Sequence, residues 1–318
     1  VDDIDAVDVL ELSGANHVFA LKHRLGEHLA AHAFAGETRA HRVGRIGSLV
    51  IAEFSTQHTE LSGRTIRESG LRDATGLNVV AAWARGRLEP AYPDRVLGRD
   101  DVVVVVGTEE QLDVLDEDFL VTEPTAEPIL IIGGGRVGQA AARALKELGQ
   151  PVHVVERERG LRRTLERVAD RVVIGNAANL DVMKDAGIAN APSVLLSTRD
   201  DATNIFITVY SRRLNPGCRI VSRVTHEPNL DAIHRAGANF VLSESSLGAR
   251  LLLNVLLGGE LIAIGENVEI FKSPLPETLH NLSLVQSGIG AKTGLLVIGV
   301  EIAGQTLVVP GVNEPLGP

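Results

Sequence analysis

A glycine-rich segment is the part of the chain whose residue types and spacing most clearly indicate chemistry. Residues 133–138 read Gly-Gly-Gly-Arg-Val-Gly, a G-x-G-x-x-G pattern, and they directly follow the apolar run 129–132. In such a loop Gly133 permits a tight turn, Gly135 lets the backbone approach a phosphate, and Gly138 lets a helix lie close to a strand. The first N–H groups of that helix would face the phosphate. The pattern therefore predicts nucleotide binding, with glycines kept only for packing as the alternative.

An acidic residue follows at a distance that suits a ribose. Glu156 ends the next apolar run, 152–155, about 20 residues after the loop. A carboxylate at this position accepts hydrogen bonds from a ribose diol and disfavours a 2′-phosphate, and thus NADP. We therefore expect NAD(H) or ADP/ATP as the ligand.

Other residues that could contact the ligand lie in the glycine loop or at the carboxyl ends of the predicted strands. This is the edge where ligands bind in open parallel sheets. These residues are Arg136, Val137, Arg157, Asn176, Ala177, Ser197 and Thr198. Arg136 could reach a phosphate of its own or a neighbouring subunit's ligand, and Asn176 could touch the adenosine half. Asp200 and Asp201 fit a helix cap or turn slightly better than a ligand contact.

Histidines provide a weaker metal-binding pattern. His28 and His32 are four residues apart on a predicted helix, with His23 nearby, a spacing that can chelate a metal. A second polar group consists of His226, Glu227 and Glu244. Because spacing fixes no third ligand in either group, a polar helix surface or subunit contact is the better interpretation, and we expect no metal.

Proton-transfer residues of a dehydrogenase are not evident in the sequence. Neither Tyr92 nor Tyr210 has a lysine four residues later, and the glycine loop lacks the Lys-Ser/Thr of a P-loop. The pattern favours a sensor over an enzyme. An NAD-dependent oxidoreductase and a purely structural assembly module remain the alternatives.

Composition excludes several classes of protein. The 31 Lys and Arg against 41 Asp and Glu give a net charge of −10, which argues against a nucleic-acid binder. Hydrophobic residues make up 44% and aromatic residues 3%, so the core must be aliphatic. The single cysteine, Cys218, excludes an intramolecular disulfide. No apolar run approaches the ~18 residues of a membrane span. The chain starts at Val1, so we expect a fragment of a longer protein.

Alternating strands and helices must position the candidate residues. Apolar, β-branched runs predict strands at 129–132, 152–155, 172–174, 194–197, 219–224 and 240–242. Amphipathic spacing predicts helices at about 137–148, 160–168, 178–186, 201–214 and 228–236. This order indicates an α/β lobe, a Rossmann-like doubly wound parallel sheet with helices on both faces.

The chain also repeats itself. Residues 14–18, Gly-Ala-Asn-His-Val, return as Gly-Ala-Asn-Phe-Val at 237–241. A second block recurs 218 residues later without a gap, pairing Ser69 with Ser287 and Thr75 with Thr293. Two blocks in the same order predict a tandem duplication. After this second block, the first copy is expected to continue with a strand at 101–107 and a helix from Glu109. The second copy stops at Pro318, just before the position of that strand.

These motifs together resemble the regulator-of-potassium-conductance domain (RCK, also KTN or Trk-type N-terminal domain). The matching pieces are 131–138, 154–156, 175–178, 196–204, 220–224 and 236–241. Residues 61–69 and 106–112 resemble the smaller C-terminal lobe of the same family. Where the family often has Gly-Asp-Ala-Thr, this chain has Gly175-Asn176-Ala177-Ala178, which weakens one ligand contact and leaves the nucleotide open.

The resemblance implies a division into six parts. Residues 1–43 would be the last helix, last strand and crossover helix of a first N-lobe, and 44–119 its C-lobe. After a linker at 120–127, residues 128–247 would be the second, nucleotide-binding N-lobe. A crossover helix at 248–263 and a truncated C-lobe at 264–318 would complete the chain, so two small α+β lobes flank the sheet.

The resemblance further implies a cytosolic, ligand-sensing module of a potassium channel or transporter. Such domains form homodimers through their crossover helices and assemble into rings beneath a membrane pore, at the inner face of the cell membrane. Ligand binding shifts the ring between conformations and so controls potassium transport. A channel tail is favoured over a separate transporter regulator because the chain starts within a fold.

Overall fold

The computed structural model describes residues 1, 5–34, 40–56, 59–84, 87–99, 101–120, 126–256, 261–265, 268–302, 305–308, 313 and 315–316. The chain forms two compact units. The first consists of Val1–Glu37, Arg85–Arg87 and Thr122–Val255, and the second of Thr38–Ala84, Leu88–Val121 and Leu256–Pro318. Among the described residues, no helix combines the length and the apolar character that crossing a membrane requires.

A six-stranded parallel sheet forms the centre of the first unit, with strand order β11-β10-β9-β6-β7-β8. The strands are β6 (Ile129–Ile132), β7 (Val152–Glu156), β8 (Arg171–Ile174), β9 (Ser193–Leu196), β10 (Arg219–Val224) and β11 (Phe240–Ser243). The chain moves outward from β6 to β8 and then returns to β9 on the other side of β6. This reversal confirms the doubly wound fold and makes the β6–β9 edge the topological switch point.

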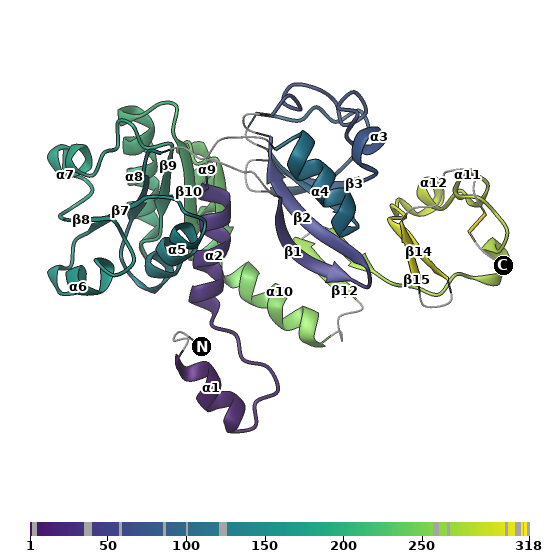
Figure 1. Cartoon of the computed structure of the whole chain (residues 1–318), viewed down its shortest axis with the longest axis horizontal. Helices are drawn as coiled ribbons and strands as arrows, with labels where there is room; N and C mark the ends of the chain where they lie inside the picture. Colours follow the sequence, from purple (N-terminus) through teal and green to yellow (C-terminus); the bar gives the residue numbers. More distant parts are fainter. Residues whose placement is uncertain are drawn as a thin grey trace. The chain divides into compact units, whose positions relative to one another are not determined.

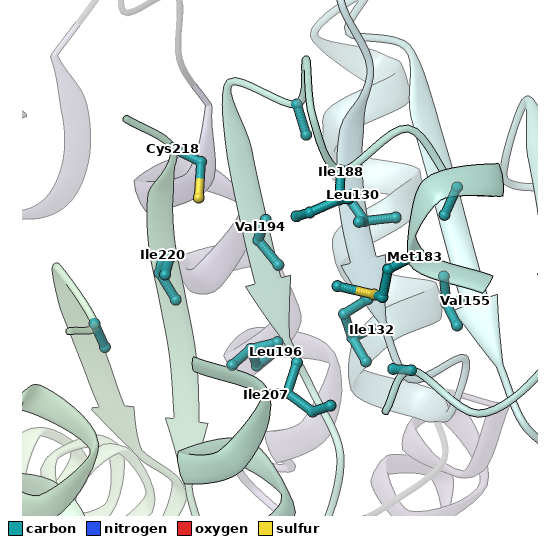
Figure 2. Packing of buried hydrophobic residues seen from close by; sticks show 14 of the residues in the cluster. Leu130, Ile132, Val155, Met183, Ile188, Val194, Leu196, Ile207, Cys218 and Ile220 are labelled. Atoms are coloured by element: carbon teal, nitrogen blue, oxygen red, sulfur yellow. The ribbon is translucent and has the colours of Figure 1, made fainter. Parts of the chain in front are cut away.

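Three helices cover one face of this sheet, over the aliphatic core in Figure 2. They are α7 (Leu180–Asp185), α8 (Asp201–Leu214) and α9 (Leu230–Arg235), the last preceded by a short 3-10 turn, Glu227–Asn229. Met183 and Ile207 from these helices pack against the strand residues Ile132 and Leu196. Cys218 lies in the same cluster, where burial raises its pKa to about 11. The core is therefore aliphatic, as the composition predicted.

The other face is covered by α5 (Arg136–Glu147), α6 (Arg162–Leu165, after the 3-10 turn Arg159–Leu161) and a helix from the start of the chain, α2 (Leu21–Ala33). Because α7 to α9 all pack on the first face, no other described helix covers β9 to β11 on the second face. Without α2 these strands would expose apolar side chains there. Leu25, Leu29 and Ala33 of α2 are fully buried at helical spacing. In Figure 1 this purple helix lies beside the teal α5.

The second unit contains a five-stranded antiparallel sheet of order β1-β2-β5-β3-β4. The strands are β1 (His41–Ile46), β2 (Leu49–Ser55), β3 (Asn78–Ala84), β4 (Arg87–Pro90) and β5 (Val102–Gly107). The predicted strand at 101–107 is thus confirmed as the central, buried β5. The helix expected from Glu109 is confirmed as α4 (Glu109–Asp118), which begins with a capping box between Thr108 and Gln111.

The duplication is visible in the hydrogen bonds. The Ser69 and Ser287 hydroxyls each donate to the carbonyl three residues earlier, at 2.6 and 2.8 Å. The Thr75 and Thr293 hydroxyls each donate to the carbonyl four residues earlier, at 2.7 and 2.6 Å. Left-handed glycines flank the short helices α3 (Leu71–Thr75) and α12 (Ile289–Thr293), at Gly70, Gly76, Gly288 and Gly294. The predicted repeat therefore extends to local geometry.

The second copy of the small lobe has two separate hairpins among its described residues. β12 (Leu261–Gly265) pairs with β13 (Val268–Phe271), and β14 (Gly299–Ile302) pairs with β15 (Gln305–Val308). Between them lie a 3-10 turn, Glu277–Leu279, and α11 (Leu284–Ser287), which precedes α12. In the first copy, β5 lies between the strand pairs β1-β2 and β3-β4 and joins them into one sheet.

Two sequence expectations need correction. Residues 1–43 are expected to include the last strand of a first lobe, but the described residues between α1 (Asp5–Leu12) and α2 form no strand. The crossover helix expected at 248–263 is α10 (Glu244–Leu256), and residues 261–263 belong to β12. Gly258 and Gly259 follow α10 in the sequence, and glycines disfavour helix continuation. Linker residues 121–125 lie outside the described residues.

Candidate nucleotide-binding site

Packing and backbone conformation require three of the four glycines among residues 133–138, which form the loop after β6 and the first turn of α5. Gly133 adopts φ 103°, and a Cβ there would also lie 3.0 Å from the Ser197 hydroxyl. A Cβ on Gly134 would lie 2.4 Å from Leu165, and one on Gly138 would lie 2.0 Å from the Gly133 carbonyl oxygen. Packing and backbone conformation therefore explain these three positions without any ligand.

Gly135 is different from its neighbours. Its φ of −68° is available to any residue, and a Cβ built on it would meet no described atom within 4 Å. Neither strain nor packing against the described residues thus accounts for a glycine here. Open space directly before a helix N-terminus is the room that a phosphate needs to approach the backbone.

The start of α5 is also electrostatically suited to an anion. Gly135 is its N-cap residue, and no described side chain caps this end. The first N–H groups of a helix have no partner within the helix and carry its positive dipole end. Arg136 is exposed at the first position, while Val137 is buried and holds the helix against the lobe.

Glu156 lies next to the loop. Its carboxylate accepts hydrogen bonds from the Gly134 N–H at 2.6 Å and from the Glu158 N–H at 2.8 Å. These two bonds fix the carboxylate at the end of β7 while leaving it only half buried. An acidic group held rigidly beside the loop is placed as a ribose acceptor must be. Arg157 is exposed immediately after it.

Ser197 and Thr198 join the loop to the end of β9, across the switch point. The Ser197 hydroxyl donates to the Gly133 carbonyl oxygen at 2.7 Å and so holds the first turn of the loop. The Thr198 hydroxyl donates to the Asn204 side-chain oxygen at 2.6 Å. Ser197 is buried and Thr198 partly exposed, so of these two only Thr198 offers its side chain to a ligand.

Asn176 and Ala177 are less directly oriented toward a ligand. The Asn176 side-chain oxygen accepts from the Ala178 N–H at 3.0 Å, an Asx turn after β8. The Ala177 side chain is part of the buried core cluster. The structure therefore brings Gly133, Gly135, Glu156 and Thr198 to one end of β6, β7 and β9, whereas Asn176 serves a turn and Ala177 the core.

Asp200 and Asp201 have structural roles, as the capping interpretation predicted for them. Asp200 is the N-cap of α8, and its carboxylate accepts from the Thr203 N–H. The buried Asp201 accepts from the N–H groups of Thr225 and His226 and from the Asn229 amide. Burial alone would raise the pKa of Asp201, but these hydrogen bonds lower it below its ordinary value.

The histidine groups do not converge. His32 is buried and stacks on Phe240 with ring centroids 3.7 Å apart. His23 pairs with Glu27. In the second polar group, His226 pairs with Asp201, whereas Glu244 pairs with Arg223. Within the described ranges, no three His, Cys, Asp or Glu side chains gather as a metal site would.

Sequence reasoning did not single out Asn204, which organises this edge of the sheet. Its side chain is fully buried, and its amide donates to the carbonyl oxygens of Thr198 at 3.0 Å and Arg223 at 3.2 Å. A polar residue within the amphipathic pattern of a predicted helix, three positions after Asp201, was the available signal. A buried amide must find partners, and here it finds them on two strand ends.

The described residues fit an adenine nucleotide. The open space at Gly135 and the uncapped α5 suit a phosphate, and Glu156 suits a ribose. All of these residues belong to the first unit.

Comparison with known proteins gives matches along most of the chain. The profile of the TrkA-N domain matches residues 129–244, and that of the TrkA-C domain matches residues 51–120. Potassium channel protein 1 of Methanocaldococcus jannaschii is 29% identical over 191 residues, which are 57% of this chain and 57% of that protein. The match thus spans less than two thirds of this relative's length.

Two solved structures resemble the whole chain. The GsuK RCK domain is 31% identical with a TM-score of 0.70, and the match covers 100% of this chain and 69% of that one. The GsuK channel bound to NAD is 33% identical with a TM-score of 0.71, covering 100% of this chain and 57% of the other. Both similarities extend over the two units described above.

Proposed function

Since this chain belongs to the RCK family, whose TrkA-N and TrkA-C domains it carries, we propose that it senses an adenine nucleotide and thereby regulates potassium transport. The NAD-bound GsuK channel supports NAD(H) as a ligand, and the site chemistry accommodates ADP or ATP equally. In this proposal residues 128–247 are the sensing lobe, and 44–119 and 264–318 are the two small lobes, joined by the linker 120–127. The crossover helices would be α2, within residues 1–43, and α10 (Glu244–Leu256).

The ligand would lie across the end of β6. Its phosphates would face the backbone of Gly133, Gly135 and Gly138 and the start of α5, and Glu156 would accept from its ribose. Its remaining contacts would come from residues on the rim of the same edge, namely Arg136, Val137, Arg157, Asn176, Ala177, Ser197 and Thr198. A nucleotide that binds one conformation of the assembly more tightly shifts the population toward it.

The observation that carries the proposal is the open space at Gly135, directly before the start of α5. Gly135→Ala adds one methyl group into space that no described atom fills, so the fold should be retained. The methyl group would collide with a bound phosphate. We expect calorimetric titration with NAD, NADH, ADP and ATP to show saturable binding of at least one, with a Kd raised about tenfold or more by the substitution.

Gly217→Ala is the matched control, because Gly217 is also unstrained and lies at the opposite edge of the sheet, with only the Asn215 side chain nearby at 3.8 Å. It should bind like the wild type. If the folded wild type binds none of the four nucleotides, or if Gly135→Ala binds as tightly as Gly217→Ala, the proposed site is wrong.

The proposed partners are a second copy of the chain and a potassium pore at the inner face of a membrane. α10 is the repeat of α2, with Leu247-Gly248 in place of Leu25-Gly26, yet Leu252, Leu253 and Leu256 on α10 are exposed. In α2, by contrast, Leu29, Ala30 and Ala33 are buried in the first unit. A homodimer through crossover helices, with assembly into a ring, would cover this apolar face.

The proposal assigns no catalysis to the chain. A dehydrogenase would need a proton-transfer group beside the nicotinamide, and the sequence pattern offers none. Hydride transfer from NADH to any of a panel of small carbonyl compounds would overturn this assignment. The complete reading frame would decide between a channel tail and a separate transporter regulator, according to whether it also encodes a pore.

A further inference from the structure

A series of hydrogen bonds, linked through the adjacent residues Ser197 and Thr198 and through Arg223 itself, connects the nucleotide loop to the first residue of α10. We propose that this path, Ser197–Thr198–Asn204–Arg223–Glu244, transmits nucleotide occupancy to α10, with Asn204 as its central positioning residue. The proposal rests on the nucleotide site above and adds the route by which nucleotide binding at that site affects α10.

The first step joins the loop to the end of β9. The Ser197 hydroxyl donates to the Gly133 carbonyl oxygen at 2.7 Å, and its own N–H donates to the Ile132 carbonyl oxygen at 3.0 Å. A Cβ at Gly133 would lie 3.2 Å from the Thr198 nitrogen. The loop and residues 197–198 are therefore in direct contact. A ligand that binds the loop would also restrict the motion of residues 197–198.

The second step runs through Asn204. Its side-chain oxygen accepts from the Thr198 hydroxyl at 2.6 Å, and its amide donates to the Thr198 carbonyl oxygen at 3.0 Å and the Arg223 carbonyl oxygen at 3.2 Å. The side chain is fully buried. Because a buried amide without partners is costly, a shift of Thr198 must be followed by Asn204 or by the end of β10.

The third step reaches α10 through the Arg223 side chain. Arg223 is only 3% exposed, and its guanidinium pairs with the carboxylate of Glu244, which begins α10. Burial lowers the pKa of Arg223, whereas the Glu244 charge opposes this effect. A buried cation depends on its partner, so Glu244 and the start of α10 are constrained to follow Arg223.

The path ends at α10, the helix that we propose takes part in the dimer contact. α10 repeats α2 and exposes leucines that the proposed dimer would bury. A change at the first turn of α10 would alter how this helix presents that face. Every residue of the path lies in the first unit, so the coupling needs no particular arrangement of the two units.

Hydrogen–deuterium exchange of the 318-residue chain, with and without saturating NAD, tests the path. In the wild type we expect NAD to slow amide exchange in 244–256 by about threefold or more. In Asn204→Leu, which keeps the branched shape of the side chain but removes the three hydrogen bonds, NAD should still bind and this change should be lost.

Asn215→Leu is the matched control. Asn215 follows the other end of α8, and its amide also donates to two main-chain carbonyl oxygens, those of Ile188 and Ala191, at 2.9 Å each. It lies at the edge of the sheet away from the loop. This variant should lose similar stability but keep the full NAD effect on 244–256.

A second variant covers the case in which Asn204→Leu does not fold. Glu244→Gln keeps the shape of the side chain but removes its charge, and should reduce the NAD effect on 244–256 by about half or more while leaving the NAD affinity within about threefold of the wild type. An unchanged NAD effect in Asn204→Leu or Glu244→Gln would overturn the path. So would NAD binding to the wild type without any change in 244–256. Failure of NAD, ADP and ATP to bind at all would overturn the proposed function itself, and the path with it.

Discussion

At the scale of single residues, the glycine loop separates what the fold needs from what a ligand needs. A Cβ at Gly138 would lie 2.0 Å from the Gly133 carbonyl oxygen, whereas one at Gly135 would meet no described atom within 4 Å. The same motif thus contains a packing glycine and a glycine that neither close packing nor a positive φ requires. The alternative that the loop is kept for packing alone therefore accounts for Gly138 but not for the open space at Gly135.

Gly138→Ala should therefore destabilise the protein, by about 1–3 kcal/mol, because the colliding atom is main chain and cannot rotate away. Gly135→Ala should cost less, at most about 1 kcal/mol, because alanine is a poorer N-cap residue than glycine but restricts the unfolded chain more. Urea unfolding of both variants measures the difference. Equal stability of the two would show that the loop is not packed as described.

Asp201 provides a pH-dependent prediction. Hydrogen bonds hold its folded-state pKa below the ordinary value of about 3.9, so the unfolded chain binds this proton more readily. The stabilisation is fully present above that ordinary pKa and is lost as the pH falls through the folded-state pKa. Asp201→Asn should thus cost about 1–3 kcal/mol at pH 7, and the difference from the wild type should shrink below about pH 4. A difference that is constant with pH in urea unfolding would contradict this account.

At the scale of elements, the sheet was largely predictable from the sequence. Its strands are short apolar runs separated by glycine, proline and polar turns, and local patterns of this kind survive folding. The position of α2 was not predictable, because residues 1–43 resemble the end of a preceding lobe while the helix packs on α5. Packing partners that are distant in sequence leave no local pattern. The same holds for Asn204, whose role depends on β9 and β10 meeting.

The contact between α2 and α5 depends on Gly26. A Cβ there would lie 2.5 Å from the Val137 carbonyl oxygen and 2.6 Å from the Ala140 Cβ. We expect Gly26→Ala to separate the helices and cost about 1–3 kcal/mol. Gly160→Ala, at a position with no described atom within 4 Å, is the control and should change little. Indistinguishable urea midpoints of the two variants would show that α2 does not pack closely on α5.

At the scale of the whole molecule, the two units should respond differently to the ligand. The loop, Glu156 and Thr198 all belong to the first unit. A ligand stabilises the state it binds, by about 2.7 kcal/mol at a concentration of 100 Kd. Calorimetric unfolding should therefore show NAD raising the transition of the first unit, with the antiparallel sheet of the second unit unaffected. A shift confined to the second unit would place the ligand elsewhere.

The most direct test of the central claim is potassium flux through the pore that we propose this chain regulates, measured in vesicles with and without NAD, for the wild type and Gly135→Ala. The account predicts that NAD changes the wild-type flux by about fivefold or more and that the substitution removes this response. An identical NAD response in the two proteins would contradict the claim that the glycine loop is the sensor.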